Sequence, residues 1–245
     1  MSVADRLLEL AHTDERAVLF TVLDGPRRGT KLLVLLECGE TVGDGPDELV
    51  ELAPDVRRSH VLELGDARVF AELFGPPPSL VVVGAVDTAE ALCRATRLIG
   101  WHTVCVDARA AFATSARIPS AEELVVAWPE DAFRRIPLGR ETAVVTLAHD
   151  DRFDLPTLAA ALRSEAFYIG AIGSRKTQQH RRELLLEAGF THEELKRIHG
   201  PAGLDIGAET PAETAFAILG EMLAVRAERP GTPLRDSPHR IHVER

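Results

Sequence analysis

The amino-acid sequence predicts an α/β protein in which a doubly wound parallel sheet follows a small N-terminal α+β domain. Three observations support this fold class. The apolar run LVVVGA at 80–85 is continuous, as in a strand covered on both faces. Segments with helical periodicity alternate with such runs from there onward, which is the order of a parallel sheet with crossover helices. Three prolines at 76–78 precede this alternation, and proline continues neither a helix nor a central strand.

The proline-rich break divides the chain into parts that we expect to fold separately. The expected parts are a small N-terminal domain at 1–74, a linker at 75–79, a larger domain at 80–229 and a tail at 230–245. Within the first part, the pattern predicts a helix at about 3–12 and strands at 17–23 and 31–37, joined by the turn DGPRRGT.

The elements of the larger domain follow from its apolar pattern. Strands are expected at 80–85, 102–107, 142–149 and 166–172, with a shorter strand-like run at 124–128 after the capping-box spacing of SAEE. Helices are expected at about 88–100, at 155–164 with a proline at its start, and at 177–188, 192–198 and 211–228. Thr210, Pro211 and Glu213 give the last helix an N-cap, a first-position proline and a capping-box glutamate.

The composition excludes several classes of function. The net charge is -10 and the pI is about 5.4, so no global positive charge attracts nucleic acid or anionic lipid. No apolar run approaches the roughly 20 residues that span a bilayer, and the N-terminal segment lacks the pattern of a signal peptide. The three cysteines form no paired motif and no metal-ligand spacing occurs, so we expect a cytoplasmic protein without a metal site. Cys38, at the end of a strand, and Cys105, inside one, are expected to be buried structural cysteines.

The turn after the first parallel strand has part of a dinucleotide-binding fingerprint. Gly84 and Ala89 fit its first and third positions, and Asp107 ends the next strand, where an acidic residue holds a ribose hydroxyl. Val86 replaces the second glycine, and Asp87 adds negative charge where a phosphate would lie. The order of elements predicts a Rossmann-like fold. Two interpretations of the turn stay open, a modified nucleotide site and a purely structural turn.

Charged residues follow two further strands at this edge of the sheet, where ligands bind in doubly wound folds. Asp107 and Arg109 are candidates to contact a ribose and a neighbouring phosphate, and the alternative is a surface ion pair. His149 and Asp150 are candidates for ligand contact, because a histidine can bind an oxygen, transfer a proton or ligate a metal. In the alternative, this segment is a solvated loop and Asp154 caps the next helix.

A third candidate is the segment GSRKT, which lies between a buried strand and a helix. Gly173 permits close backbone approach, and the helix N-terminus supplies free N–H groups and a partial positive charge. Ser174 and Thr177 add hydroxyl groups, while Arg175 and Lys176 add full positive charge. Cations are unfavourable at a helix N-terminus unless an anion is bound, so the segment predicts a phosphate or other oxyanion site. In the alternative, both cations point into water.

Three motifs resemble the XdhC/CoxI family, the xanthine dehydrogenase accessory factors. They are LAHDDRFDLPTLAAALRS, YIGAIGSRKT and GPAGLDIGAETPAETAFAILGEMLAVRA, and the resemblance covers roughly 80–228. It implies a Rossmann-like C-terminal domain that binds the molybdenum cofactor as cargo. It also implies that residues 173–177 and the loop carrying Gly203 and Asp205 belong to the binding region. The N-terminal part departs from the family, because Gly43-Asp44-Gly45-Pro46 replaces a glycine-rich stretch and contains no cysteine.

The resemblance leads to a first functional hypothesis, an accessory protein without catalytic residues. Such a protein would bind molybdenum cofactor, support its sulfuration by a cysteine desulfurase and pass it to a molybdenum hydroxylase apo-enzyme. Two alternatives remain. One is an NAD(P)-dependent oxidoreductase, which is supported by Asp107 and by the Rossmann-like order of strands and helices. The other is a non-catalytic regulator with a decayed nucleotide site. A homodimer is also expected, since the N-terminal part is short for an independent domain.

Overall fold

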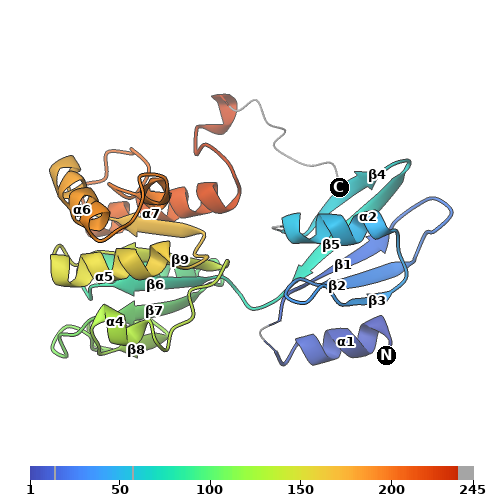
Figure 1. Ribbon diagram of the computed structural model, residues 1–245, viewed down its shortest axis with the longest axis horizontal. Helices are drawn as coiled ribbons and strands as arrows, with labels where there is room; N and C mark the ends of the chain where they lie inside the picture. Colours follow the sequence, from blue (N-terminus) through green and yellow to red (C-terminus); the bar gives the residue numbers. More distant parts are fainter. Residues whose placement is uncertain (14, 57, 237–245) are drawn as a thin grey trace. The chain divides into compact units, whose positions relative to one another are not determined.

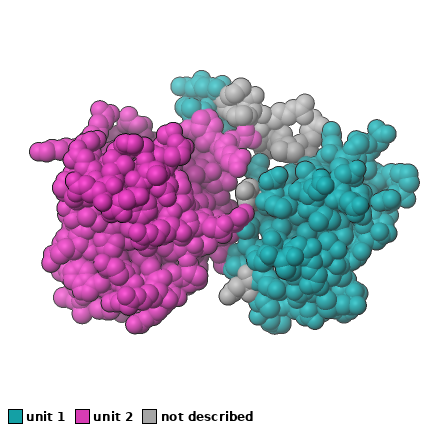
Figure 2. Space-filling view, viewed as in Figure 1, with its two compact units in different colours: residues 1–76, 232–245 teal, residues 77–231 magenta. Residues whose placement is uncertain are grey.

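The computed structural model describes residues 1–13, 15–56 and 58–236. The chain forms two compact units, one of residues 1–76 with the described part of 232–245, and one of residues 77–231 (Figure 2). The boundary between Pro76 and Pro77 lies inside the expected linker, while the division into four parts stays a prediction. Among the described residues, no helix has both the length and the apolar character needed to cross a membrane.

The first unit contains a five-stranded antiparallel sheet in the order β3-β2-β1-β5-β4. Its elements are α1 (Val3–Leu10), β1 (Ala17–Val22), β2 (Lys31–Leu35), β3 (Thr41–Gly43), α2 (Asp47–Leu52), η1 (Ala53–Asp55), β4 (His60–Leu64) and β5 (Ala67–Phe74). A short helix η3 (Leu234–Asp236) also groups with this unit. The sequence pattern predicted α1, β1 and β2 but did not indicate the β4–β5 hairpin, which turns at Gly65 with a φ of 58°.

The alternation of side chains along β1 explains why both faces of this sheet are covered. Val18 and Phe20 belong to the apolar cluster that includes Leu49 of α2. Ala17 and Leu19 face the opposite way and pack with residues of α1. Successive strand residues point to opposite faces, so a continuous apolar run requires a cover on each side. Helices α1 and α2 accordingly lie on opposite faces of the sheet (Figure 1).

The second unit contains six parallel strands in the order β11-β10-β9-β6-β7-β8. Its elements are β6 (Ser79–Val83), α3 (Asp87–Arg97), β7 (His102–Val106), β8 (Glu123–Val125), α4 (Pro129–Ala132), β9 (Thr142–Thr146), α5 (Asp151–Leu162), β10 (Tyr168–Ala171), α6 (Arg175–Glu187), η2 (Glu194–Arg197), β11 (Ile198–His199) and α7 (Pro211–Arg226). The strand order reverses between β6 and β9. The predicted Rossmann-like, doubly wound fold is therefore confirmed.

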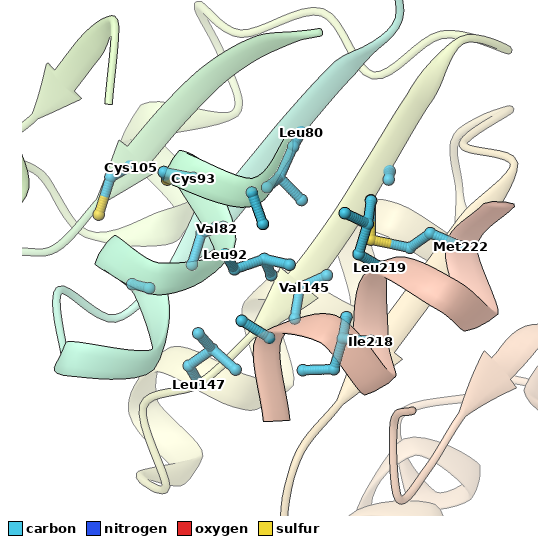
Figure 3. Close-up of a cluster of buried hydrophobic side chains, with 14 of the residues drawn as sticks. Leu80, Val82, Leu92, Cys93, Cys105, Val145, Leu147, Ile218, Leu219 and Met222 are labelled. Carbon is cyan, nitrogen blue, oxygen red and sulfur yellow. The ribbon is translucent and has the colours of Figure 1, made fainter. Parts of the chain in front are cut away.

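Helices cover both faces of this parallel sheet. The apolar cluster on one face joins strand residues to Leu92 of α3 and to residues of α7. Its members drawn in Figure 3 include Leu80, Val82, Val145, Leu147, Ile218, Leu219 and Met222. On the other face, Val81 and Val83 pack with Phe153 of α5, and Ile169 packs with Leu185 of α6. The four strands β6, β7, β9 and β10 thus bury both of their faces, as their continuous apolar sequences predicted.

Three local predictions differ from the structure, and one short strand is confirmed. Helix α5 begins at Asp151 rather than near 155, because Asp150 caps it and Pro156 lies within it. The strand-like run expected at 124–128 is present as the short strand β8, which covers Glu123–Val125. The helix expected at 192–198 is a short 3₁₀ turn followed by β11. Cys38, expected to be buried, is exposed, whereas Cys105 is buried as expected.

Candidate functional site

The strand order reverses at β6 and β9, so the loops after these strands form the switch point of the sheet. Gly84 follows β6 with a φ of 105°. A Cβ at Gly84 would lie 2.9 Å from the backbone nitrogen of Ala148 and 3.0 Å from its Cα, in the loop after β9. The missing side chain of Gly84 therefore lets the two loops approach each other.

Asp107 follows β7 and is completely buried. Its carboxylate accepts hydrogen bonds from the backbone N–H groups of Ala85, at 2.8 Å, and Arg109, at 2.9 Å. The Arg109 side chain donates to both oxygens, at 2.9 and 2.7 Å. Burial raises the pKa of Asp107, but the bonds from Arg109 and Ala85 outweigh it and hold that pKa below its usual value. These four bonds fill the carboxylate, so contact with a ribose, which stays a prediction, would require Arg109 to move.

His149 and Asp150 form the loop between β9 and α5. His149 is exposed and has a φ of 55°, a left-handed conformation that is uncommon for residues other than glycine. Asp150 caps α5 by accepting from the backbone N–H of Arg152 at 3.0 Å, so the alternative in which Asp154 is the cap is wrong. The side-chain bond from Arg152, followed by its backbone N–H, lowers the pKa of Asp150 to about 2. Arg109 adds to this effect, so the loops after β7 and β9 interact electrostatically.

Residues 173–177, which we call the anion cradle, connect β10 to α6. Ser174 is the N-cap of α6, and its Oγ accepts from the backbone N–H of Thr177 at 3.1 Å. The two hydroxyl oxygens of Ser174 and Thr177 lie 3.0 Å apart, so one hydroxyl hydrogen is used between them. The capping role explains why Ser174 is a serine, and only one of the two hydroxyl donors remains for a ligand.

The anion cradle retains free donors. Within the described parts of the chain, the backbone N–H groups of Arg175 and Lys176 have no acceptor, and neither side chain has an ion-pair partner. The first turn of α6 contains no acidic residue. Gly173 has a φ of 124°, and a Cβ there would lie 3.2 Å from the Thr177 side chain. Two free amides, one hydroxyl and two cations beside a glycine fit an oxyanion.

The loop after β11 lies beside the anion cradle. The side-chain nitrogen of Gln178 donates to the backbone oxygens of Ala171, at 3.0 Å, and Ile172, at 3.2 Å. A Cβ at Gly200 would lie 2.5 Å from the Gln178 side chain, and the N–H of Ala202 donates to Ala171 at 3.0 Å. The beginning of the loop that carries Gly203 therefore contacts the start of α6. Asp205 is exposed, and no hydrogen bond or ion pair among the described residues joins it to the cradle.

A half-buried polar cluster that the sequence pattern did not reveal holds the same loop. Glu221 of α7 accepts from the Tyr168 hydroxyl at 2.5 Å and from the Gly203 N–H at 2.8 Å. The Nδ1 of His199 lies 3.2 Å from Glu221, and the rings of His199 and Tyr168 are stacked. A glutamate among the apolar residues of α7 was the available signal. Glu221 thus fixes Gly203 against the end of the sheet.

The Glu221 contacts predict a pH dependence. Burial raises the pKa of Glu221, but hydrogen bonds from His199, Tyr168 and Gly203 outweigh it and lower that pKa below its usual value. The stabilisation is therefore present above about pH 4.3, the unfolded value, and is lost as pH falls through the folded pKa. We expect Glu221→Gln to lower the melting temperature at pH 7 and to flatten its decline between pH 5 and 3. Thermal unfolding of both proteins would contradict this if their pH profiles ran parallel.

Asp154 and Arg181 form a second polar feature that the sequence pattern did not reveal. Their side chains are 1% and 2% exposed and form an ion pair between α5 and α6. Arg181 also donates to the backbone oxygen of Ile172, the residue before the anion cradle. No sequence signal identifies this pair, because the two residues lie 27 positions apart.

The structure links most of the predicted site residues along one edge of the sheet. Asp107 bonds to Ala85, and Arg109 lies near Asp150 and 5.4 Å from the Phe153 ring. His180 of α6 is 3.1 Å from Asp151, at the first position of α5. These contacts connect the loops after β6, β7 and β9, and the His180–Asp151 contact joins helix α6 to helix α5. Among the described residues, no group of three or more His, Cys, Asp or Glu side chains is arranged to hold a metal.

Comparison with known proteins identifies the family. The family described as "XdhC Rossmann domain" matches residues 80–222, more than half of the chain. The chain therefore belongs to the XdhC family. The expected resemblance is confirmed, and the match coincides with the parallel-sheet unit that carries the anion cradle.

Several individual proteins are similar to this chain. Escherichia coli YqeB, which is uncharacterized, is 29% identical over 74% of this chain and 34% of its own length. A Bacillus subtilis protein, named as a probable subunit of xanthine dehydrogenase, is 27% identical over 79% of this chain and 57% of its own. The Escherichia coli molybdenum cofactor insertion chaperone PaoD is 38% identical over 86 residues, which are 35% of this chain and 27% of PaoD. This chain thus spans between about a quarter and just over half of these relatives.

A solved structure agrees with the fold. It is a crystal structure from Bacillus halodurans described as a xanthine dehydrogenase, with a TM-score of 0.56 and 19% identity. The superposition covers 97% of this chain and 98% of that one, so both units have counterparts in the solved structure. At this level of identity the likeness concerns the fold alone.

Proposed function

We propose that this protein binds the molybdenum cofactor and delivers it to a molybdenum hydroxylase of the xanthine-dehydrogenase type. The single observation that carries the proposal is the anion cradle of an XdhC-family domain, with free amides at Arg175 and Lys176. The similarity to a molybdenum cofactor insertion chaperone supports it. A chaperone requires reversible binding, which exposed donors at a loop can provide.

In this proposal each loop has a distinct role. The cofactor is the cargo, and its phosphate would accept hydrogen bonds from the amides of Arg175 and Lys176, whose side chains add positive charge. His149, exposed at the switch point, would contact the remainder of the cargo. Glu221 would keep Gly203 in place beside the cradle. These roles position and neutralise the cargo without a covalent step.

The proposal includes partners and a setting. The apo-hydroxylase would receive the cofactor, and a cysteine desulfurase would supply sulfur while the cofactor is bound. We further propose a cytoplasmic homodimer. An NAD(P)-dependent oxidoreductase stays an alternative prediction, but the filled carboxylate of Asp107 weighs against it.

The proposal is tested by the pterin content of the purified protein. Protein isolated from cells that make the molybdenum cofactor should release a fluorescent pterin on oxidation. The same protein from a strain unable to make the pterin is the control and should release none. Equal fluorescence from the two preparations would overturn the proposed function.

A further inference from the structure

The buried ion pair of Arg181 and Asp154 lies beneath the loops of the candidate site. Arg181 lies in the second turn of α6, one turn after Thr177. Asp154 lies in the first turn of α5. Asp154 also accepts from the hydroxyl of Thr146, the last residue of β9. Arg181 also donates to the carbonyl of Ile172, which directly precedes the anion cradle. The pair thus contacts the ends of β9 and β10.

Stability alone does not account for this pair. Burying two charges costs desolvation energy, and apolar residues of similar volume often stabilise a core equally well. The Nε of Arg181 is buried and has no hydrogen-bond partner among the described residues, which adds to that cost. A guanidinium nevertheless offers what an apolar side chain cannot, a rigid fork that bonds a carboxylate and a carbonyl simultaneously. Its two acceptors here are the Asp154 carboxylate, in the helix that follows the β9 loop, and the Ile172 carbonyl, at the start of the loop after β10.

We propose that Arg181 and Asp154 are a positioning pair for the anion cradle. By holding the Ile172 carbonyl, Arg181 fixes the direction in which the chain enters Gly173. A Cβ at Gly173 would lie 3.4 Å from Arg181 Nη1, so the guanidinium directly underlies the turn. Asp154 holds the guanidinium in this orientation, and Thr146 holds Asp154. The orientation of the amides of Arg175 and Lys176 toward an anion then depends on this buried chain of contacts.

The inference rests on the proposed function, because it concerns the same site, and two variants of Thr146 test it. Thr146→Val removes the hydroxyl donor but keeps the shape, whereas Thr146→Ser keeps the donor. Arg181→Lys keeps the charge but loses the fork. Inorganic phosphate is the probe, titrated calorimetrically at low ionic strength into variants whose circular dichroism shows that they are folded. We expect about tenfold weaker binding for Thr146→Val and Arg181→Lys, as for other supporting residues of binding sites, and near-normal binding for Thr146→Ser.

Hydrogen–deuterium exchange of peptides covering 168–178 provides a readout that needs no ligand. We expect faster exchange there in Thr146→Val and Arg181→Lys, with Thr146→Ser restored to the wild-type rate. Folded variants that equal the wild type in both exchange and phosphate affinity would overturn the positioning role and leave the cradle intact. A wild-type protein that binds no phosphate would instead overturn the cradle itself and the proposed function with it.

Discussion

Replacing both cations of the anion cradle, Arg175→Gln with Lys176→Gln, is expected to weaken phosphate binding by about tenfold, or ~1.4 kcal/mol. The two side chains supply the full positive charge beside the free amides, and the variant keeps only the amides and one hydroxyl donor. The same change should slightly raise stability, by a few tenths of a kcal/mol, because cations are unfavourable at a helix N-terminus. A loss of binding together with a gain in stability cannot arise from unfolding.

A matched control for this variant is Arg134→Gln with Arg135→Gln. These residues are also consecutive and exposed, and they lie between α4 and β9, outside the anion cradle. The net charge changes equally, so any general electrostatic effect is the same. Calorimetric titration with phosphate at low and moderate salt should show near-normal affinity for the control. If both double variants lost affinity equally, the effect would belong to the overall charge and not to the cradle.

Removing the buried guanidinium, in Arg181→Met, is expected to cost about 3–5 kcal/mol of folding free energy. The Asp154 carboxylate is 1% exposed and would be left with only the Thr146 hydroxyl as a partner in the described structure. A loss of this size should lower the melting temperature by roughly 6–20 °C.

Two further variants separate the unpaired charge from the lost packing. Arg181→Met combined with Asp154→Leu removes both charges, so most of the loss should be recovered. Arg182→Met, a neighbouring change on the same helix, should stay within about 0.5 kcal/mol of the wild type. Urea unfolding followed by circular dichroism measures all three. A double variant as unstable as Arg181→Met alone would mean that packing, and not an orphaned charge, dominates the effect.

The sequence predicted the parallel sheet well because burial on both faces leaves a direct mark in continuous apolar runs such as 80–85. Helix boundaries were predicted less accurately where two signals competed. Pro156 pointed to a helix start, but Asp150 supplies the cap and the helix accommodates the proline in its interior. The β4–β5 hairpin was missed because neither of its strands is a continuous apolar run. Charged residues interrupt the apolar positions in both strands.

The candidate site was predictable where its residues are consecutive. Gly173, Ser174 and the two following cations adjoin in the chain, so their composition and position were enough to indicate an oxyanion site. The supporting contacts are non-local, since Tyr168 bonds to Glu221 across 53 positions. The sequence left an Asp107–Arg109 pair open only as a surface contact. It did not indicate that Asp107 is buried and also accepts from the Ala85 amide, because that depends on tertiary packing.

The central claim is that residues 173–177 hold the negatively charged part of the cargo. A crystal structure of this protein with bound molybdopterin tests it most directly. We expect the cofactor phosphate within hydrogen-bonding distance of the backbone nitrogens of Arg175 and Lys176. The claim would be contradicted if the electron density placed the phosphate away from these amides and residues 173–177 had the same conformation with and without the cofactor.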